Sequence, residues 1–194
     1  MALMEVNFFS KALMRPVTMN VILPVDKVFF GEETEEENKP FKTLYLLHGV
    51  MGNYTDWVTG TCIKRWAEEK NLAVVMPSGA NMFYMDHPNA NENYSEFIGK
   101  ELVKITRRMF PLSHKKEDTF IAGLSMGGYG AIRNGLKYHD TFGYIAGLSS
   151  AMILEKMRTA HEWDFWNRYI KRVLDWLPLD KDSKEGMNSG NVGL

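Results

Sequence analysis

The chain has 194 residues, 45% of them apolar, and a formal net charge of −1. This size suits one sizeable core, so we expect a single domain over residues 1–194, and the absence of a basic stripe argues against nucleic acid as a partner. Residues 1–16 lack the apolar core of a signal peptide, and no stretch approaches the ~20 apolar residues of a membrane span. We therefore predict a cytoplasmic protein without a membrane partner.

The N-terminal part of the chain predicts three strands. Residues 5–9 and 17–24 alternate apolar and polar side chains, which is typical of antiparallel strands. The charged run 31–40 indicates a solvent-exposed loop. The apolar run 43–47 that follows predicts a buried parallel strand.

Helices and strands then alternate along the middle of the chain. We expect a helix near 62–70, a short buried strand at 73–77, a long polar loop at 78–93 and a helix over 94–110. Such alternation indicates βαβ units, and hence an α/β fold whose mostly parallel sheet carries helices on both faces. Ligands of such sheets bind at the C-terminal ends of the strands.

The most informative motif is the pentapeptide Gly123–Gly127, which fits G-x-S-x-G. It follows an apolar, β-branched run at 119–124 and precedes a helical repeat that starts at Met126. A serine at such a junction lies in a strained turn that exposes its hydroxyl, so we predict that Ser125 is a nucleophile. The alternative is a glycine-rich turn with an incidental serine. Beyond this motif and its helix, a further strand is expected at 142–148.

A second motif, His48-Gly49-Val50, follows the buried strand at 43–47. Hydrolases with this arrangement place an oxyanion donor in such a loop, so the backbone N–H groups of Val50 and Met126 are the predicted pair. His48 resembles a catalytic base, but its place inside the turn favours a structural role.

The predicted substrate pocket uses the loops beside Ser125, with Met51, Trp57 and Tyr84 as candidates, although Trp57 could equally be a core residue. Residues 155–177 are either a lid or a packing helix, and their apolar stripe favours core packing. We expect the lone Cys62 to be a buried small residue. No metal-ligand or phosphate-binding motif is present, so we predict no metal and no cofactor.

The sequence resembles the esterase D-like branch of the α/β-hydrolases over about residues 1–155. The resemblance is carried by LYLLHGVMGNYTDW, VVMPSG and DTFIAGLSMGGYGAIRNGLKYHDTFGYIAGLSS. This branch includes tributyrin, acetyl and feruloyl esterases and S-formylglutathione hydrolases. The resemblance implies an α/β-hydrolase fold and a serine carboxylesterase acting on short-chain or aryl acyl esters of the acetyl or feruloyl type, carbohydrate-linked ones included. It also implies Ser125 as the nucleophile that carries the acyl group, and Val50 and Met126 as oxyanion donors.

The C-terminal part departs from that pattern. The fold orders its triad as serine, acid, histidine, but only His139 and His161 follow Ser125, and no histidine follows the aspartates at 175–182. We therefore expect the N-terminal three-quarters of an esterase, truncated before its last strands, with an exposed sheet edge that could pair with a second copy. Two alternative functions stay open: a catalytically silent hydrolase-like binding protein, and an S-formylglutathione-type thioesterase, although no basic patch favours the latter.

Overall fold

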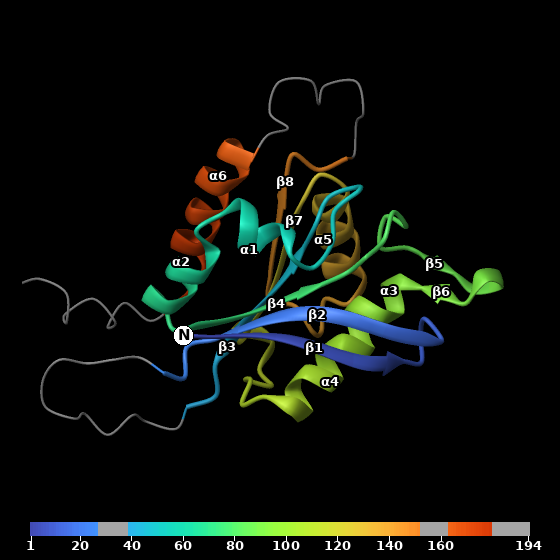
Figure 1. Cartoon of the computed structure of the whole chain (residues 1–194), viewed down its shortest axis with the longest axis horizontal. Coiled ribbons are helices and arrows are strands. Elements are labelled where there is room, and N and C mark those ends of the chain that lie inside the picture. The colour runs from blue at the N-terminus through green and yellow to red at the C-terminus, as the bar shows by residue number, and fades with distance from the viewer. Residues whose placement is uncertain (27–38, 152–162, 180–194) are drawn as a thin grey trace, which may run out of the picture.

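A six-stranded, mostly parallel sheet forms the centre of the computed structural model, which describes residues 1–26, 39–151 and 163–179 (Figure 1). The strand order is β1-β2-β4-β3-β7-β8, with antiparallel pairing among the first three and parallel pairing among the last four. The strands are β1 (Ala2–Ser10), β2 (Arg15–Leu23), β3 (Lys42–Leu47), β4 (Leu72–Pro77), β7 (Thr119–Leu124) and β8 (Tyr144–Leu148).

Helices connect the parallel strands, and a further helix follows β8. They are α1 (Asp56–Gly60), α2 (Ile63–Glu69), α3 (Tyr94–Glu96), α4 (Leu102–Met109), α5 (Met126–Lys137) and α6 (Trp163–Trp176). A π-helical turn at Phe97–Glu101 joins α3 to α4, so the helix predicted over 94–110 is present as one continuous element. None of the helices in the described ranges is long and apolar enough to cross a membrane.

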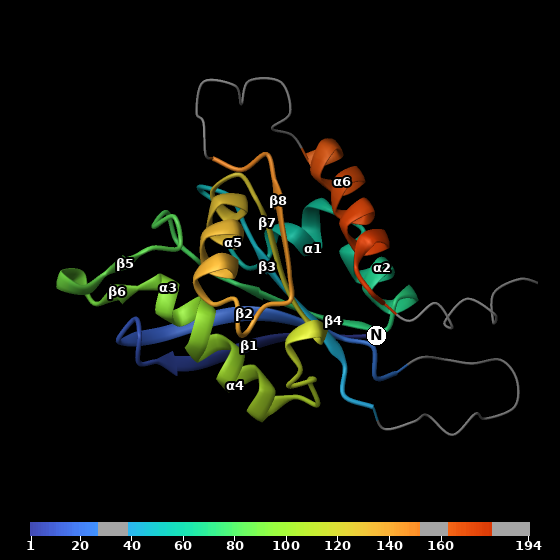
Figure 2. The ribbon, with the colours of Figure 1, turned by 180° about the vertical axis from the view of Figure 1, so that it is seen from behind.

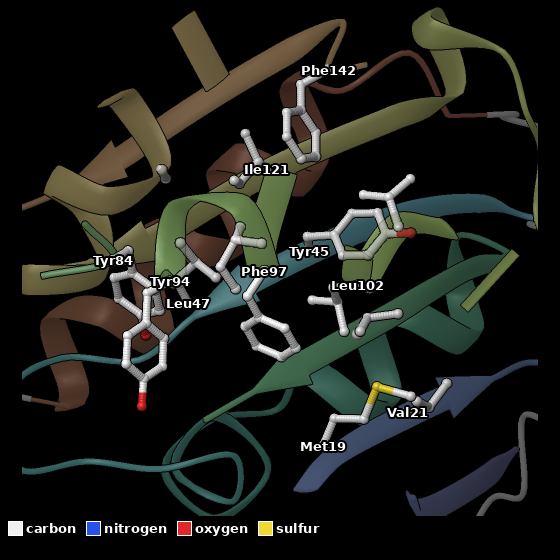
Figure 3. Packing of buried hydrophobic residues seen from close by; sticks show 14 of the residues in the cluster. Met19, Val21, Tyr45, Leu47, Tyr84, Tyr94, Phe97, Leu102, Ile121 and Phe142 are labelled. Carbon is white, nitrogen blue, oxygen red and sulfur yellow. The ribbon is translucent and has the colours of Figure 1, made fainter. Parts of the chain in front are cut away.

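The sheet separates two apolar clusters. Helices α1, α2 and α6 lie on one face, whereas α5 and the α3–α4 helix lie on the other (Figures 1 and 2). Strand β3 serves both faces, because Leu44 and Leu46 pack toward α2 and α6 while Tyr45 and Leu47 join the cluster shown in Figure 3. Burial on both faces explains why β3, β4 and β7 are continuously apolar in sequence.

The predicted α/β fold is confirmed, and its strands differ from the predicted bounds by only a few residues. Three details were wrong. The segment 78–93, predicted to be a loop, contains a small hairpin of β5 (Asp86–His87) and β6 (Glu92–Asn93), and the helix α1 was not expected. Cys62 is half-buried rather than buried. The charged run 31–40 lies almost wholly outside the described residues.

The Trp-rich helix α6 packs in the core. Ile170 and Leu174 are fully buried against the cluster that contains α2, and Trp163 makes an edge contact with the Trp57 ring at 5.9 Å. Of the two interpretations of 155–177, the structure therefore supports the packing helix for the described part. Residues 155–162 lie outside the described ranges.

Candidate active site

Ser125 occupies a strained turn between β7 and α5. Its φ of 51° and ψ of −114° are unfavourable for a residue with a side chain. The turn is held on both sides, because the Ser125 N–H donates to Leu148 O at 2.8 Å and the Ser125 carbonyl accepts the N–H groups of Tyr129 and Ala151, each at 3.0 Å. The serine thus stands at the C-terminal edge of the sheet, as its motif predicts.

The glycines of the motif are required by close backbone approach. A Cβ at Gly127 would lie 2.5 Å from His48 O, and one at Gly123 would collide with the Gly127 backbone. The turn is therefore seated directly against the end of β3 and the loop that follows it. A Cβ at Gly49 would likewise lie 3.7 Å from Ser125 Cβ, so this loop runs alongside the serine.

The two predicted oxyanion donors are the N–H groups of Val50 and Met126. They belong to the two segments that meet here, the loop after β3 and the start of α5. Val50 is half-exposed in the loop after β3, and Met126 is buried at the first position of α5. A helix N-terminus leaves its first N–H groups without intrahelical partners and favours negative charge. Within the described part of the chain, neither the Val50 N–H nor the Met126 N–H donates a hydrogen bond. Their role toward a carbonyl oxygen stays a prediction.

His48 fixes the direction of the Val50 N–H. Its Nδ1 lies 2.6 Å from Gly49 O, while its Nε2 accepts the Gly79 N–H at 2.8 Å, which assigns the proton to Nδ1. Because a trans peptide is planar, holding the Gly49 carbonyl also orients the N–H of Val50 on the same peptide unit. With both ring nitrogens engaged, His48 cannot accept the Ser125 proton, and the predicted structural role fits.

Burial lowers the pKa of His48 below its ordinary value of 6.5, opposed by the hydrogen bond to Gly49 and the charge of Asp56. Below pH 6.5 the unfolded chain therefore binds a proton that the folded chain rejects, so stability falls as the pH drops from 6.5 toward the folded-state pKa. We expect His48→Gln to flatten the dependence of the free energy of unfolding on pH between pH 7 and 5, by up to about 1.4 kcal/mol per pH unit. His139→Gln, at an exposed position, is the control; equal slopes in both variants would contradict this.

Two of the three pocket candidates were wrong. Trp57 is 1% exposed and its Nε1–H donates to Leu47 O at 3.1 Å, and Tyr84 is 0% exposed, so neither offers surface to a substrate. Met51 is 86% exposed and stays a candidate. The sequence prediction missed Asn81, whose side-chain oxygen accepts the Met51 N–H at 2.7 Å and so holds this loop to the segment after β4.

A cavity of about 400 Å³ opens between β8 and α6, beside the turn rather than over it. Ser125, Val50 and Met51 are not part of its wall, so we do not assign it to the acyl group. Its lining residues are Gly147, Leu148, Ser149, Tyr169, Arg172, Val173 and Trp176.

The described histidines other than His48 lie away from Ser125. His114 precedes β7 and thus sits at the opposite end of a strand of about 20 Å, and His139 follows α5, exposed beside Asp140 at 3.4 Å. His87 belongs to the β5–β6 hairpin, which projects from the sheet (Figures 1 and 2). His161 lies outside the described residues. The described ranges also contain no cluster of histidine, cysteine and acidic residues that could hold a metal ion.

Comparisons with known proteins point to one family. A family model described as "Putative esterase" matches residues 10–181. An acetyl esterase of Caldicellulosiruptor saccharolyticus is 47% identical over 190 residues, covering 94% of this chain and 71% of that protein. The structure of FphF, a fluorophosphonate-binding serine hydrolase of Staphylococcus aureus, superposes with a TM-score of 0.71 at 26% identity, covering 91% of this chain and 98% of that one. The S-formylglutathione hydrolase FrmB from Staphylococcus aureus gives a TM-score of 0.68 at 34% identity, with 91% and 68% covered.

Proposed function

Because the chain belongs to the esterase family, within the esterase D-like branch of the α/β-hydrolases, we propose that it hydrolyses carboxylic esters through an acyl-enzyme on Ser125. The observation that carries the proposal is the strained φ of 51° at Ser125, at a strand-to-helix turn seated against the Val50 loop. A backbone that combines this φ with a ψ of −114°, outside the left-handed helical region, is typical of a functional site. The resemblance to an acetyl esterase supports short-chain acyl groups as the substrate class.

The proposed reaction has two halves. In the first, Ser125 Oγ forms a bond to the ester carbonyl carbon, the carbonyl oxygen becomes an oxyanion, and the Val50 and Met126 N–H groups stabilise its charge. The C–O bond to the alcohol then breaks, and the serine proton passes through a base to that alcohol. In the second half, a base takes a proton from water, whose oxygen bonds to the acyl carbon; the bond from that carbon to Ser125 Oγ then breaks, the carboxylic acid leaves and Oγ regains the proton. Losing one oxyanion donor costs about 2.7–4 kcal/mol of barrier in comparable sites.

Labelling with a fluorophosphonate probe tests this proposal directly. An activated serine displaces fluoride and retains the phosphonyl group, so intact mass spectrometry should show a single adduct and peptide mapping should place it on Ser125. Rapid labelling elsewhere, or none at all, would favour the second candidate, a catalytically silent hydrolase-like binding protein. That candidate is supported by the position of the described histidines away from the serine.

The free edge of β8 supports a further part of the proposal, pairing with a second copy of the chain. Among the described strands β8 has only β7 as a neighbour, and most of it is half-exposed, unlike the other parallel strands. Beside it, Trp176 on α6 is 58% exposed and makes an edge contact with Tyr144 at 5.4 Å. Two β8 edges related by a two-fold axis could pair antiparallel and cover these rings.

We expect the chain to sediment as a dimer and Trp176→Glu to shift it toward the monomer, because a charge would be buried at the shared edge. Met14→Glu is the matched control, since Met14 is equally exposed at 61% but lies in the turn between β1 and β2, at the opposite sheet edge. Monomeric wild-type protein in analytical ultracentrifugation would refute the pairing.

A further inference from the structure

Tyr84 connects the nucleophile helix to the loop that carries Val50. Its ring is fully buried in the cluster of Figure 3, and its hydroxyl donates to His48 O at 3.0 Å. Burial raises the pKa of Tyr84 well above 10, so the hydroxyl keeps its proton and remains a donor. The hydrogen bond fixes the peptide unit between His48 and Gly49, directly before the unit that contains the Val50 N–H.

The ring of Tyr84 has little freedom to move. A Cβ at Gly130 would come within 2.5 Å of it, and Gly79 also leaves no room for a side chain there, so two glycines form its slot. The backbone of Tyr84 is itself held at a φ of 54°. These contacts place a rigid aromatic spacer between α5, which begins next to Ser125, and the loop after β3.

A buried amide fastens the other end of this spacer. Asn134 of α5 is fully buried, and its Nδ2 donates to Tyr84 O at 3.1 Å and to Gly130 O at 2.9 Å, while its Oδ1 accepts the Ser95 hydroxyl at 2.6 Å. All of these polar atoms are partnered, which is the condition under which a buried network is rigid. The helix behind Ser125 and the His48 carbonyl are therefore joined through Tyr84.

We propose that Tyr84 is a positioning residue that sets the oxyanion loop, residues 48–50, relative to Ser125. The proposal rests on the proposed function, but it adds a residue to the machinery that touches neither the substrate nor the nucleophile. His48 orients the Val50 peptide through its ring, and Tyr84 anchors the preceding peptide through its hydroxyl. Loss of the Tyr84 hydroxyl should leave the fold intact and increase the mobility of the oxyanion loop.

The test compares Tyr84→Phe with Tyr45→Phe. Tyr45 is an equally buried tyrosine in the same cluster, but its hydroxyl meets the Thr106 hydroxyl at 2.8 Å, away from the Val50 loop. Each variant loses one buried hydroxyl, so both should lower the melting temperature by a similar amount, about 2–4 °C. Only Tyr84→Phe should accelerate amide hydrogen exchange in residues 48–52, roughly 2- to 10-fold.

The second measurement is hydrolysis of 4-nitrophenyl acetate. A loop displaced by ~1 Å costs up to about 10²-fold in rate, so we expect kcat of Tyr84→Phe to fall about 10- to 100-fold with KM almost unchanged, and kcat of Tyr45→Phe to stay near wild type. Equal exchange at 48–52 in the two variants would overturn the positioning role. Wild-type protein without hydrolysis would instead defeat the proposed function, and the exchange comparison alone would then decide the role of Tyr84.

Discussion

Ser125→Ala is expected to abolish both the fluorophosphonate adduct and the hydrolysis of 4-nitrophenyl acetate. Alanine can hold the turn as serine does, because its Cβ is the same and the backbone hydrogen bonds to Leu148, Tyr129 and Ala151 do not involve the hydroxyl. The variant should therefore fold normally. Without Oγ no acyl-enzyme can form, and the loss of a nucleophilic serine costs about 10⁶-fold in kcat in a comparable serine hydrolase. Intact mass and initial rates measure the two effects.

Ser150→Ala provides the control for this experiment. Its hydroxyl lies close to the same turn, 2.7 Å from where a Cβ of Gly128 would stand, so a general disturbance of the region would affect it too. We expect this variant to keep the adduct and the wild-type rate. If Ser125→Ala retained either property, Ser125 would not be the nucleophile and the acyl-enzyme mechanism would fall.

The turn at Ser125 could be predicted because the local sequence pattern and the tertiary packing require the same small residues there. Glycine is required at 123 and 127 because a Cβ at either position would collide with neighbouring backbone atoms. The strand before Ser125 is apolar because helices cover both faces of the sheet. The structural role of His48 was also accessible, because a residue inside a tight turn has little freedom to reach a distant serine. At such positions the residue type by itself indicates the structural constraint.

The prediction of the substrate pocket failed for the opposite reason, because the residue type alone did not decide where the side chains lie. Trp57 and Tyr84 are aromatic residues close in sequence to the predicted site, and an aromatic side chain serves a substrate pocket and an apolar core equally well. Their positions are decided by contacts with other parts of the fold. The Trp57 indole donates to Leu47 O, and the Tyr84 ring lies in the slot between Gly79 and Gly130. Neither contact leaves a periodic or motif-like signal in the sequence.

The identity of the base leads to the other large expected effect. The chain contains five histidines. His48 has both ring nitrogens engaged, His114 stands at the far end of β7, and His139 lies beyond the end of α5. With His87 on the projecting hairpin, His161 is left as the histidine through which this chain could activate its own serine. His161→Ala is therefore expected to lower kcat for 4-nitrophenyl acetate by about 10⁴–10⁶-fold, the cost of removing a triad member.

His139→Ala is the matched control for this measurement, because His139 is an exposed histidine beside Asp140 whose loss should change neither kcat nor the rate of adduct formation. The contrary outcome has a clear physical meaning. His161 precedes the aspartates at 175–182, against the order of serine, acid and histidine in this fold. If wild type and His161→Ala hydrolysed the ester equally slowly, catalysis would come only from the oxyanion donors and binding, about 10³–10⁴-fold over water. The chain alone would then be a hydrolase-like protein without a working base, and His161 would have no part in catalysis.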